Sequence, residues 1–353
     1  MTNRRITHIS TGALLLAVSV TSACGTDHQA VQSLDPDGMA QGPADPAAVD
    51  PVDAVGAADP AETTDPTGTT APSVPVTIDP TSPDELLFQQ ALAEYEALNY
   101  AVAQQLFEQL VVDYPSSPRV DNAAYLAARS IYALDDLIGS ETAFSDFLTT
   151  YPMSTFDHAA EYFLGRVHFR QVLFPEALTD FQGALARDTA GLYADNSQYY
   201  IGRTQFELAQ FPEAQTELSQ LAVDYPDSTY LDNGFYYLGR THFELAQYDD
   251  ALVAFASVAD NPTSTYLDNA QYYVGRTHYA AGDLDTAFAD WVTFEASYPD
   301  SIFLDNSIYY RARVRTDQLD CAAAGVLLVD LETRFPTSTF LVLTQDYLTQ
   351  GGC

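Results

Sequence analysis

The sequence predicts an all-α fold made of seven helical hairpins and one final capping helix. One arginine recurs every 36 or 37 residues between positions 129 and 313. In almost every repeat a small residue is followed four positions later by a bulky one, as at Ala214 and Leu218, and a proline such as Pro226 comes soon afterwards. A repeat of this length indicates stacked helical units that bury one continuous core together. The repeated arginines are Arg129, Arg166, Arg203, Arg240, Arg276 and Arg313.

Each repeat contains two amphipathic segments, helix A and helix B, in which apolar and aromatic residues recur at helical spacing. Proline ends helix B because it has no amide with which to continue the hydrogen-bond ladder. We expect an aspartate to cap each helix A by accepting hydrogen bonds from its unpaired amides. The capping candidates are Asp195, Asp232, Asp268 and Asp305.

Seven expected starts of helix B define the seven hairpins: Ala101, Ile138, Pro175, Pro212, Asp249, Asp285 and Ala322. The last helix, from about Thr339 to Leu348, would cover the apolar end of the stack. The third repeat departs from the pattern, because Asp188-Thr189 stands where the other repeats carry Tyr-Pro or a close relative. We expect a differently shaped loop there.

The first 23 residues are typical of an export signal. Arg4 and Arg5 precede an apolar stretch of ten residues, which is too short to span a bilayer as a helix. Cys24 follows small residues in a segment that resembles a bacterial lipobox, so we expect lipidation of Cys24 after removal of residues 1–23. Ordinary cleavage after Ala23, without a lipid, is the alternative.

Residues 24–83 are predicted to form an acidic, disordered tether rich in proline, alanine and threonine. The segment has no aromatic residue, so it cannot bury enough apolar surface to offset the entropy of ordering. Residues 84–353 make up the helical domain.

The chain carries 49 acidic and 14 basic residues, a formal charge of −35. This charge repels nucleic-acid phosphates, so nucleic-acid binding is not expected. No nucleotide-binding glycine loop, zinc-protease motif or nucleophile–base pair is evident from spacing, and we predict no cofactor and no enzymatic activity. His168, His242 and His278 share one repeat position, and equivalent positions on stacked repeats do not converge on one metal ion, so we expect them to pack.

The alanine and bulky residue of helix B, the glycine before the repeated arginine and the closing proline resemble the tetratricopeptide repeat. The resemblance implies a right-handed superhelical solenoid whose A helices line a concave groove. A loop longer by three residues between B and A helices, as at residues 225–232, is similar to two bacterial envelope families. These are the Tol–Pal-associated YbgF/CpoB family and the BamD family of outer-membrane assembly lipoproteins.

The resemblance also implies a partner-binding groove built from repeated Asn, Tyr and Arg positions of helix A. An alternative is that the arginines stack on tyrosines or pair with aspartates and so stiffen the stack. We expect the arginines to be mainly structural and the tyrosines to contact a partner. The predicted groove residues are Asn196, Tyr199, Arg203, Asn233, Tyr236, Arg240, Asn269, Tyr272, Arg276, Asn306, Tyr309 and Arg313.

Cys321 and Cys353 are an even pair once Cys24 is set aside. Helix B of the last hairpin leads away from Cys321, and the capping helix leads back toward it. Hairpin geometry therefore predicts a disulfide between Cys321 and Cys353, the alternative being two free thiols.

The sequence thus predicts a lipid-anchored scaffold that faces the periplasm and binds envelope proteins or extended peptide segments. The expected role is outer-membrane organisation through Tol–Pal and cell-division coordination. Two alternatives remain open at this point, a BamD-like assembly component and a structural surface spacer. A soluble periplasmic or surface location is the alternative to a lipid anchor in the outer membrane.

Overall fold

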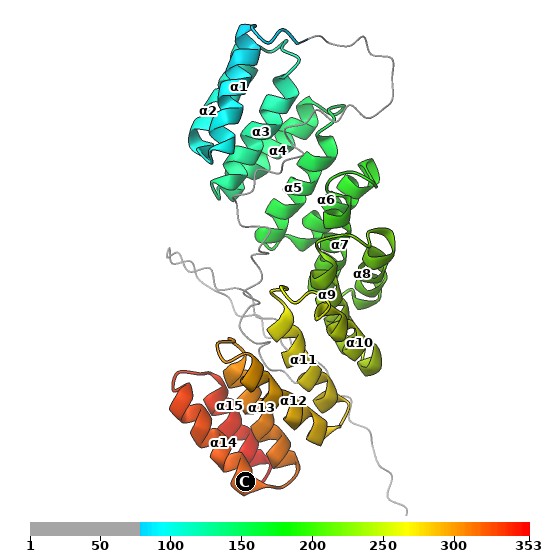
Figure 1. Ribbon diagram of the computed structural model, residues 1–353, viewed down its shortest axis with the longest axis vertical. Coiled ribbons are helices and arrows are strands. Elements are labelled where there is room, and N and C mark those ends of the chain that lie inside the picture. Colours follow the sequence, from blue (N-terminus) through cyan, green and yellow to red (C-terminus); the bar gives the residue numbers. More distant parts are fainter. Residues whose placement is uncertain (1–77) are drawn as a thin grey trace, which may run out of the picture. The chain divides into compact units, whose positions relative to one another are not determined.

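The computed structural model describes residues 78–353, which fold into fifteen α-helices and contain no β-strand (Figure 1). The first seven are α1 (Pro83–Glu96), α2 (Tyr100–Asp113), α3 (Val120–Ala133), α4 (Leu137–Thr150), α5 (Asp157–Arg170), α6 (Phe174–Arg187) and α7 (Ala194–Glu207). The remaining eight are α8 (Phe211–Asp224), α9 (Leu231–Glu244), α10 (Tyr248–Val258), α11 (Leu267–Ala280), α12 (Leu284–Ser297), α13 (Leu304–Asp317), α14 (Cys321–Arg334) and α15 (Phe340–Gln350).

Helices α1–α14 form seven antiparallel hairpins in which an odd-numbered helix A packs on the following helix B. Each helix B also packs on the next helix A, so the core is continuous along the stack. This confirms the all-α helical-repeat superhelix predicted from the sequence. Each helix B begins one residue earlier than expected, and α1 begins at Pro83, with the Ser82 hydroxyl accepting a hydrogen bond from the Glu85 amide.

The turn between the helices of every hairpin requires one residue with positive φ. Its occupants are Leu98, Asp135, Val172, Ala209, Ala246, Gly282 and Leu319. A left-handed conformation costs a residue with a Cβ about 1–2 kcal/mol; glycine escapes this cost, and Asn or Asp tolerates the conformation better than other residues. Only Gly282 in the sixth hairpin therefore adopts the turn without strain.

The predicted aspartate caps are wrong. The residues at the caps of α7, α9, α11 and α13 are aromatic, and none makes a side-chain hydrogen bond to the helix. Their φ near −100° and ψ near 10° are not the extended conformation that a capping aspartate uses. The four capping positions hold Tyr193, Tyr230, Tyr266 and Phe303.

The aspartates lie inside the first turn of helix A and join consecutive repeats instead. In α7 the Asp195 carboxylate accepts a hydrogen bond from the Asn196 amide at 2.9 Å and one from the Ser228 hydroxyl at 2.7 Å. Ser228 lies in the loop that precedes α9, 33 residues later. The same aspartate–serine bond, at 2.6–2.7 Å, links Asp84 to Ser117, Asp121 to Ser154, Asp268 to Ser301 and Asp305 to Ser338.

The junction between the third and fourth hairpins differs, as the sequence indicates. Arg187 donates hydrogen bonds to Asp157 at 3.0 Å and to Glu161, which replaces the serine contact with ion pairs. Tyr225 of the following repeat donates to the Thr189 carbonyl at 2.9 Å. The loop is therefore closed by charge and by a later tyrosine.

The last helix, α15, occupies the place that helix A of an eighth repeat would take. Phe340, Thr344 and Leu348 are buried against α13 and α14, so α15 covers the end of the core as predicted. No helix within residues 78–353 is long and apolar enough to cross a membrane. The predicted signal segment 1–23, the lipidation site Cys24 and nearly all of the predicted tether lie outside the described residues.

Candidate functional site

The predicted groove residues form one continuous set of contacts between successive A helices. The four arginines Arg203, Arg240, Arg276 and Arg313 are only 3–7% exposed, and the four tyrosines at most 2%. Asn233, Asn269 and Asn306 are also buried, and Asn196 is half-buried. The structure therefore brings these residues together, but in the interior.

Each arginine lies between aromatic rings supplied by the repeats before and after it. The Arg203 guanidinium is 4.8 Å from the Phe169 ring and 5.0 Å from the Tyr237 ring. Arg240 lies in the same way between Phe206 at 4.5 Å and Tyr273 at 5.3 Å. A desolvated cation on an aromatic face gains about 2 kcal/mol, so these contacts hold neighbouring repeats together.

The arrangement continues to the end of the stack. Arg276 lies between Phe243 at 5.1 Å and Tyr310 at 5.2 Å. Arg313 lies between Tyr279 at 5.0 Å and Tyr347 of the last helix at 4.5 Å. We call this row of arginines and rings the arginine ladder.

The tyrosines fix the arginines and are themselves covered. Tyr199 accepts a hydrogen bond from Arg203, four residues later in the same helix, at 3.3 Å. The aromatic cap of the next helix A covers the tyrosine ring, for example Phe303 on Tyr272 with ring centroids 4.8 Å apart. Burial raises the pKa of Tyr272 well above its ordinary value, as expected for a phenol held away from water.

The asparagines connect to the same set. Asn196 donates to the Tyr162 hydroxyl of the preceding repeat at 3.3 Å, and Asn306 donates to the Tyr272 hydroxyl at 3.5 Å. The expectation that the tyrosines contact a partner is therefore corrected, because rings this deeply buried offer no surface to a second molecule. The repeated Asn, Tyr and Arg positions act as connectors between hairpins.

Sequence reasoning missed the aromatic residue that covers each tyrosine. Its signal was present, since Tyr193, Tyr230, Tyr266 and Phe303 all stand two residues before the repeated aspartate. Aspartate is a more usual capping residue than tyrosine or phenylalanine, so the pattern favours the aspartate as the cap.

The three repeated histidines pack as expected, each with a polar partner. His168 Nδ1 lies 2.6 Å from Asp180 of α6, and His278 Nδ1 lies 2.6 Å from Asp290 of α12. His242 Nδ1 contacts the Gln247 side chain at 2.6 Å.

Burial raises the pKa of Asp180 to about 6, although the hydrogen bond to His168 works in the opposite direction. Among residues 78–353, no three His, Cys, Asp or Glu side chains are grouped so as to hold a metal ion.

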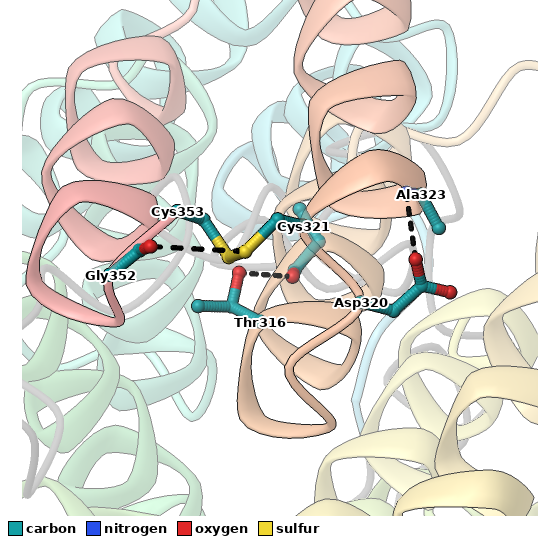
Figure 2. The surroundings of a disulfide bond; sticks show 7 residues. Thr316, Asp320, Cys321, Ala323, Gly352 and Cys353 are labelled. Carbon is teal, nitrogen blue, oxygen red and sulfur yellow. Dashed lines mark hydrogen bonds between the residues drawn. A yellow bond between two sulfur atoms is a disulfide. The ribbon is translucent and has the colours of Figure 1, made fainter.

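A disulfide joins Cys321 to Cys353, the two cysteines expected to pair. Figure 2 shows the bridge between the start of α14 and the segment that follows α15. The Cα atoms are 5.0 Å apart, within the usual range for a disulfide. Since the bridge is exposed, it fixes the position of α15 without taking part in the core.

A protein family described as an outer membrane lipoprotein, YfiO, matches residues 80–255, which comprise α1–α9 and most of α10. The chain resembles these BamD-like lipoproteins over that range. No curated protein matches the chain at a significant level.

Solved structures match the helical region. The C-terminal part of a tetratricopeptide-repeat protein from Cytophaga hutchinsonii is 18% identical, with a TM-score of 0.57 over 73% of this chain and 98% of that one. A tetratricopeptide-repeat protein from Parabacteroides merdae is 13% identical, with a TM-score of 0.50 over 76% and 99%. The chain has a tetratricopeptide-repeat fold.

A third match is Pseudomonas aeruginosa PilF, which is 13% identical with a TM-score of 0.50 over 63% of this chain and 95% of that one. At such identities the tetratricopeptide-repeat structures establish the fold alone.

Proposed function

We propose that this chain is a non-enzymatic scaffold lipoprotein that faces the periplasm and binds other envelope proteins at the outer membrane. The observation that carries the proposal is the match of hairpins 1–4 and most of hairpin 5 to an outer membrane lipoprotein family. The tetratricopeptide stack adds support, because its rigid, repeated surface suits the binding of several partners at once.

The attachment to the membrane depends on Cys24. A lipid on Cys24 would hold the hairpins at the membrane without embedding them. Radioactive palmitate should label the full chain in cells and should fail to label the Cys24→Ser variant, which should leave the membrane fraction. A chain that remains in the membrane fraction after this substitution would show that a lipid on Cys24 is not the anchor.

The resemblance to the BamD-like family favours assembly of outer-membrane proteins over the Tol–Pal and cell-division role. The two roles differ in the proteins that would crosslink to the chain in intact cells. Recovery of barrel-assembly components supports the first role, and recovery of Tol–Pal components supports the second. Recovery of neither, from cells in which a known envelope complex crosslinks normally, would contradict both and favour a surface spacer.

A further inference from the structure

Six apolar side chains are exposed along the intra-hairpin turns of the first three hairpins. Their exposed fractions run from 40% for Leu173 to 77% for Ile138. Surface leucines are common one at a time, but six exposed apolar side chains gathered on three turns mark an interaction site, although only Leu98 and Val172 share a repeat position. We call this row the turn patch; it comprises Leu98, Val102, Leu134, Ile138, Val172 and Leu173.

Neighbouring turns of the patch are in direct contact. Arg170, at the end of α5, donates to Asp135 in the α3–α4 turn. Gln171 donates to Glu141 of α4 at 3.0 Å. These bonds place the side chains of the second turn beside those of the third. The first turn occupies the equivalent position one hairpin earlier.

Folding does not explain the apolar residues of the turn patch. Leu98 and Val172 both have φ of 63°, a conformation that is especially unfavourable for the β-branched valine. The fourth, fifth and sixth hairpins build the same turn with Ala209, Ala246 and Gly282, and the seventh has Leu319, which is 78% exposed. A bulky residue here is strained and buries little surface, so its retention points to a contact outside the chain.

The surroundings of the turn patch are acidic. Glu96, Asp136 and Glu176 are exposed beside it, and the Asp135 side chain is 72% exposed. Arg170 is already engaged with Asp135. A cationic partner is therefore attracted to this edge, and an anionic lipid or acidic protein is repelled.

The spacing of the turns suits a helix. Packed helices lie roughly 8–10 Å apart, and α3 packs on α5, so the second and third turns are separated by about that distance. A helix rises 1.5 Å per residue, so apolar residues seven positions apart are also separated by about 10 Å. One face of a helix about two heptads long would therefore meet the second and third turns.

We propose that the turn patch binds a cationic amphipathic helix of a partner protein, with apolar residues at heptad spacing and Lys or Arg along their flanks. This inference rests on the proposed scaffold function and names the chemistry of one partner. The carboxylates would pair with the basic flanks, and the leucine, isoleucine and valine side chains would cover the apolar face.

The test uses the purified full chain and a fluorescent 21-residue helical peptide with leucine at heptad positions and lysine beside them. Its control peptide has glutamate in place of every lysine. The patch variant carries Ile138→Ser and Val172→Asn, since asparagine tolerates positive φ. The matched control carries Val223→Ser and Val253→Ser, which are 71% and 67% exposed on other hairpins.

Fluorescence anisotropy should show that the lysine peptide binds the original chain and the control variant equally. It should bind the patch variant about tenfold more weakly, because two apolar contacts are lost. The glutamate peptide should bind none of them. Equal binding to both variants would overturn the proposal, since it would mean attraction by net charge alone.

Two further measurements separate this inference from its alternatives. Binding of the original chain to phosphatidylcholine vesicles that is lost in the patch variant would overturn the proposal in favour of a membrane contact. In cells, unchanged capture of every crosslinked envelope partner by the patch variant would overturn it and leave the scaffold function standing. Absence of any partner for the original chain would instead refute the scaffold function, whatever the peptide result.

Discussion

Hairpins 1–3, from α1 to α6, and hairpins 4–6, from α7 to α12, share one backbone plan and use it differently. The left-handed turn position holds Ala209, Ala246 and Gly282 in hairpins 4–6, but Leu98 and Val172 in hairpins 1 and 3. The later hairpins thus expose less apolar surface at the turn, and Gly282 also adopts it without strain. The earlier hairpins retain both the exposed apolar surface and the strain.

The repeated arginine is deeply enclosed in every one of the later hairpins. In hairpins 4–6 each arginine is buried between rings from both sides. Arg129 in hairpin 2 is only half-buried and hairpin 1 has Leu92 at the equivalent position, whereas Arg166 in hairpin 3 is as buried as the later arginines. The same repeated hairpin can therefore favour rigidity in one region and surface chemistry in another. The ion-paired loop around Arg187 lies where the two regions meet.

The largest expected effect comes from removing the ladder in hairpins 4–6. Replacing Arg203, Arg240 and Arg276 together with Gln should lower the free energy of unfolding by roughly 5 kcal/mol, since each loses about 1–2 kcal/mol of cation–π and hydrogen-bond energy. Arg129→Gln in hairpin 2 should cost about 1 kcal/mol. Urea unfolding followed by circular dichroism measures both, and similar costs per residue would remove the distinction between the regions.

The next effect concerns the disulfide at the C-terminal end, which has no counterpart in hairpins 1–3. The Cys321→Ser, Cys353→Ser variant should lose about 3–4 kcal/mol at α15, because the bridge closes a loop across a separation of 32 residues. Hydrogen exchange should become faster in α15 and remain unchanged in α1–α6. A free-thiol titration on oxidised protein should find neither cysteine, and two free thiols there would refute the bridge.

A smaller effect separates the buried carboxylates of hairpins 3 and 6. Folding raises the pKa of Asp180 from an ordinary 3.8 to about 6 through burial, so the folded state keeps a proton that the unfolded state releases. Stability should therefore fall as pH rises from about 4 to 6, by about 1–2 kcal/mol after allowance for solvent.

The variant Asp180→Asn should remove this slope. The pKa of Asp290 in hairpin 6 is also raised by burial, and its side chain is somewhat more exposed than that of Asp180, so Asp290→Asn should change the slope less. Melting temperatures measured between pH 4 and 6.5 test the pair. Identical slopes for the original chain and Asp180→Asn would contradict the assignment.

The smallest effect concerns the strained turn. Val172→Gly should raise stability by about 0.5–1 kcal/mol, because relief of the positive φ exceeds the added flexibility of the unfolded chain. Ala209→Gly at the equivalent position of hairpin 4 should change stability by less. Differential scanning calorimetry resolves the two, and a destabilised Val172→Gly variant would show that the valine contributes to packing.

The number and order of the helices follow from the sequence because each hairpin buries its core with its nearest neighbours along the chain. The recurring proline and the alanine–bulky pair were enough to place seven B helices within one residue. The starts of the A helices are harder to assign from the sequence. Asp195 carries a residue type typical of a cap, yet Tyr193 takes that position because its ring is buried against Tyr162, with centroids 4.7 Å apart.

For the candidate site, too, the sequence predicts some features and the packing decides others. The repeat identified the Asn, Tyr and Arg positions and the pairing of Cys321 with Cys353, because both depend on periodicity and hairpin direction. Periodicity does not tell whether a repeated position faces solvent or the next repeat. Arg203 and Tyr199 were assigned to a groove, while the contacts that enclose them come from Phe169, Tyr230 and Tyr237 in other hairpins.

The sequence by itself determined the helical repeat, its length and its ends, since these are local properties of spacing, turn residues and proline. Only the tertiary structure decided which side chains remain at the surface. Burial depends on the packing of neighbouring hairpins, so residues with strong repeat signals became interior connectors. The turn patch, which includes Leu98, Ile138 and Val172, lies at positions that are not part of the repeat pattern. Its exposure is evident only in the folded chain.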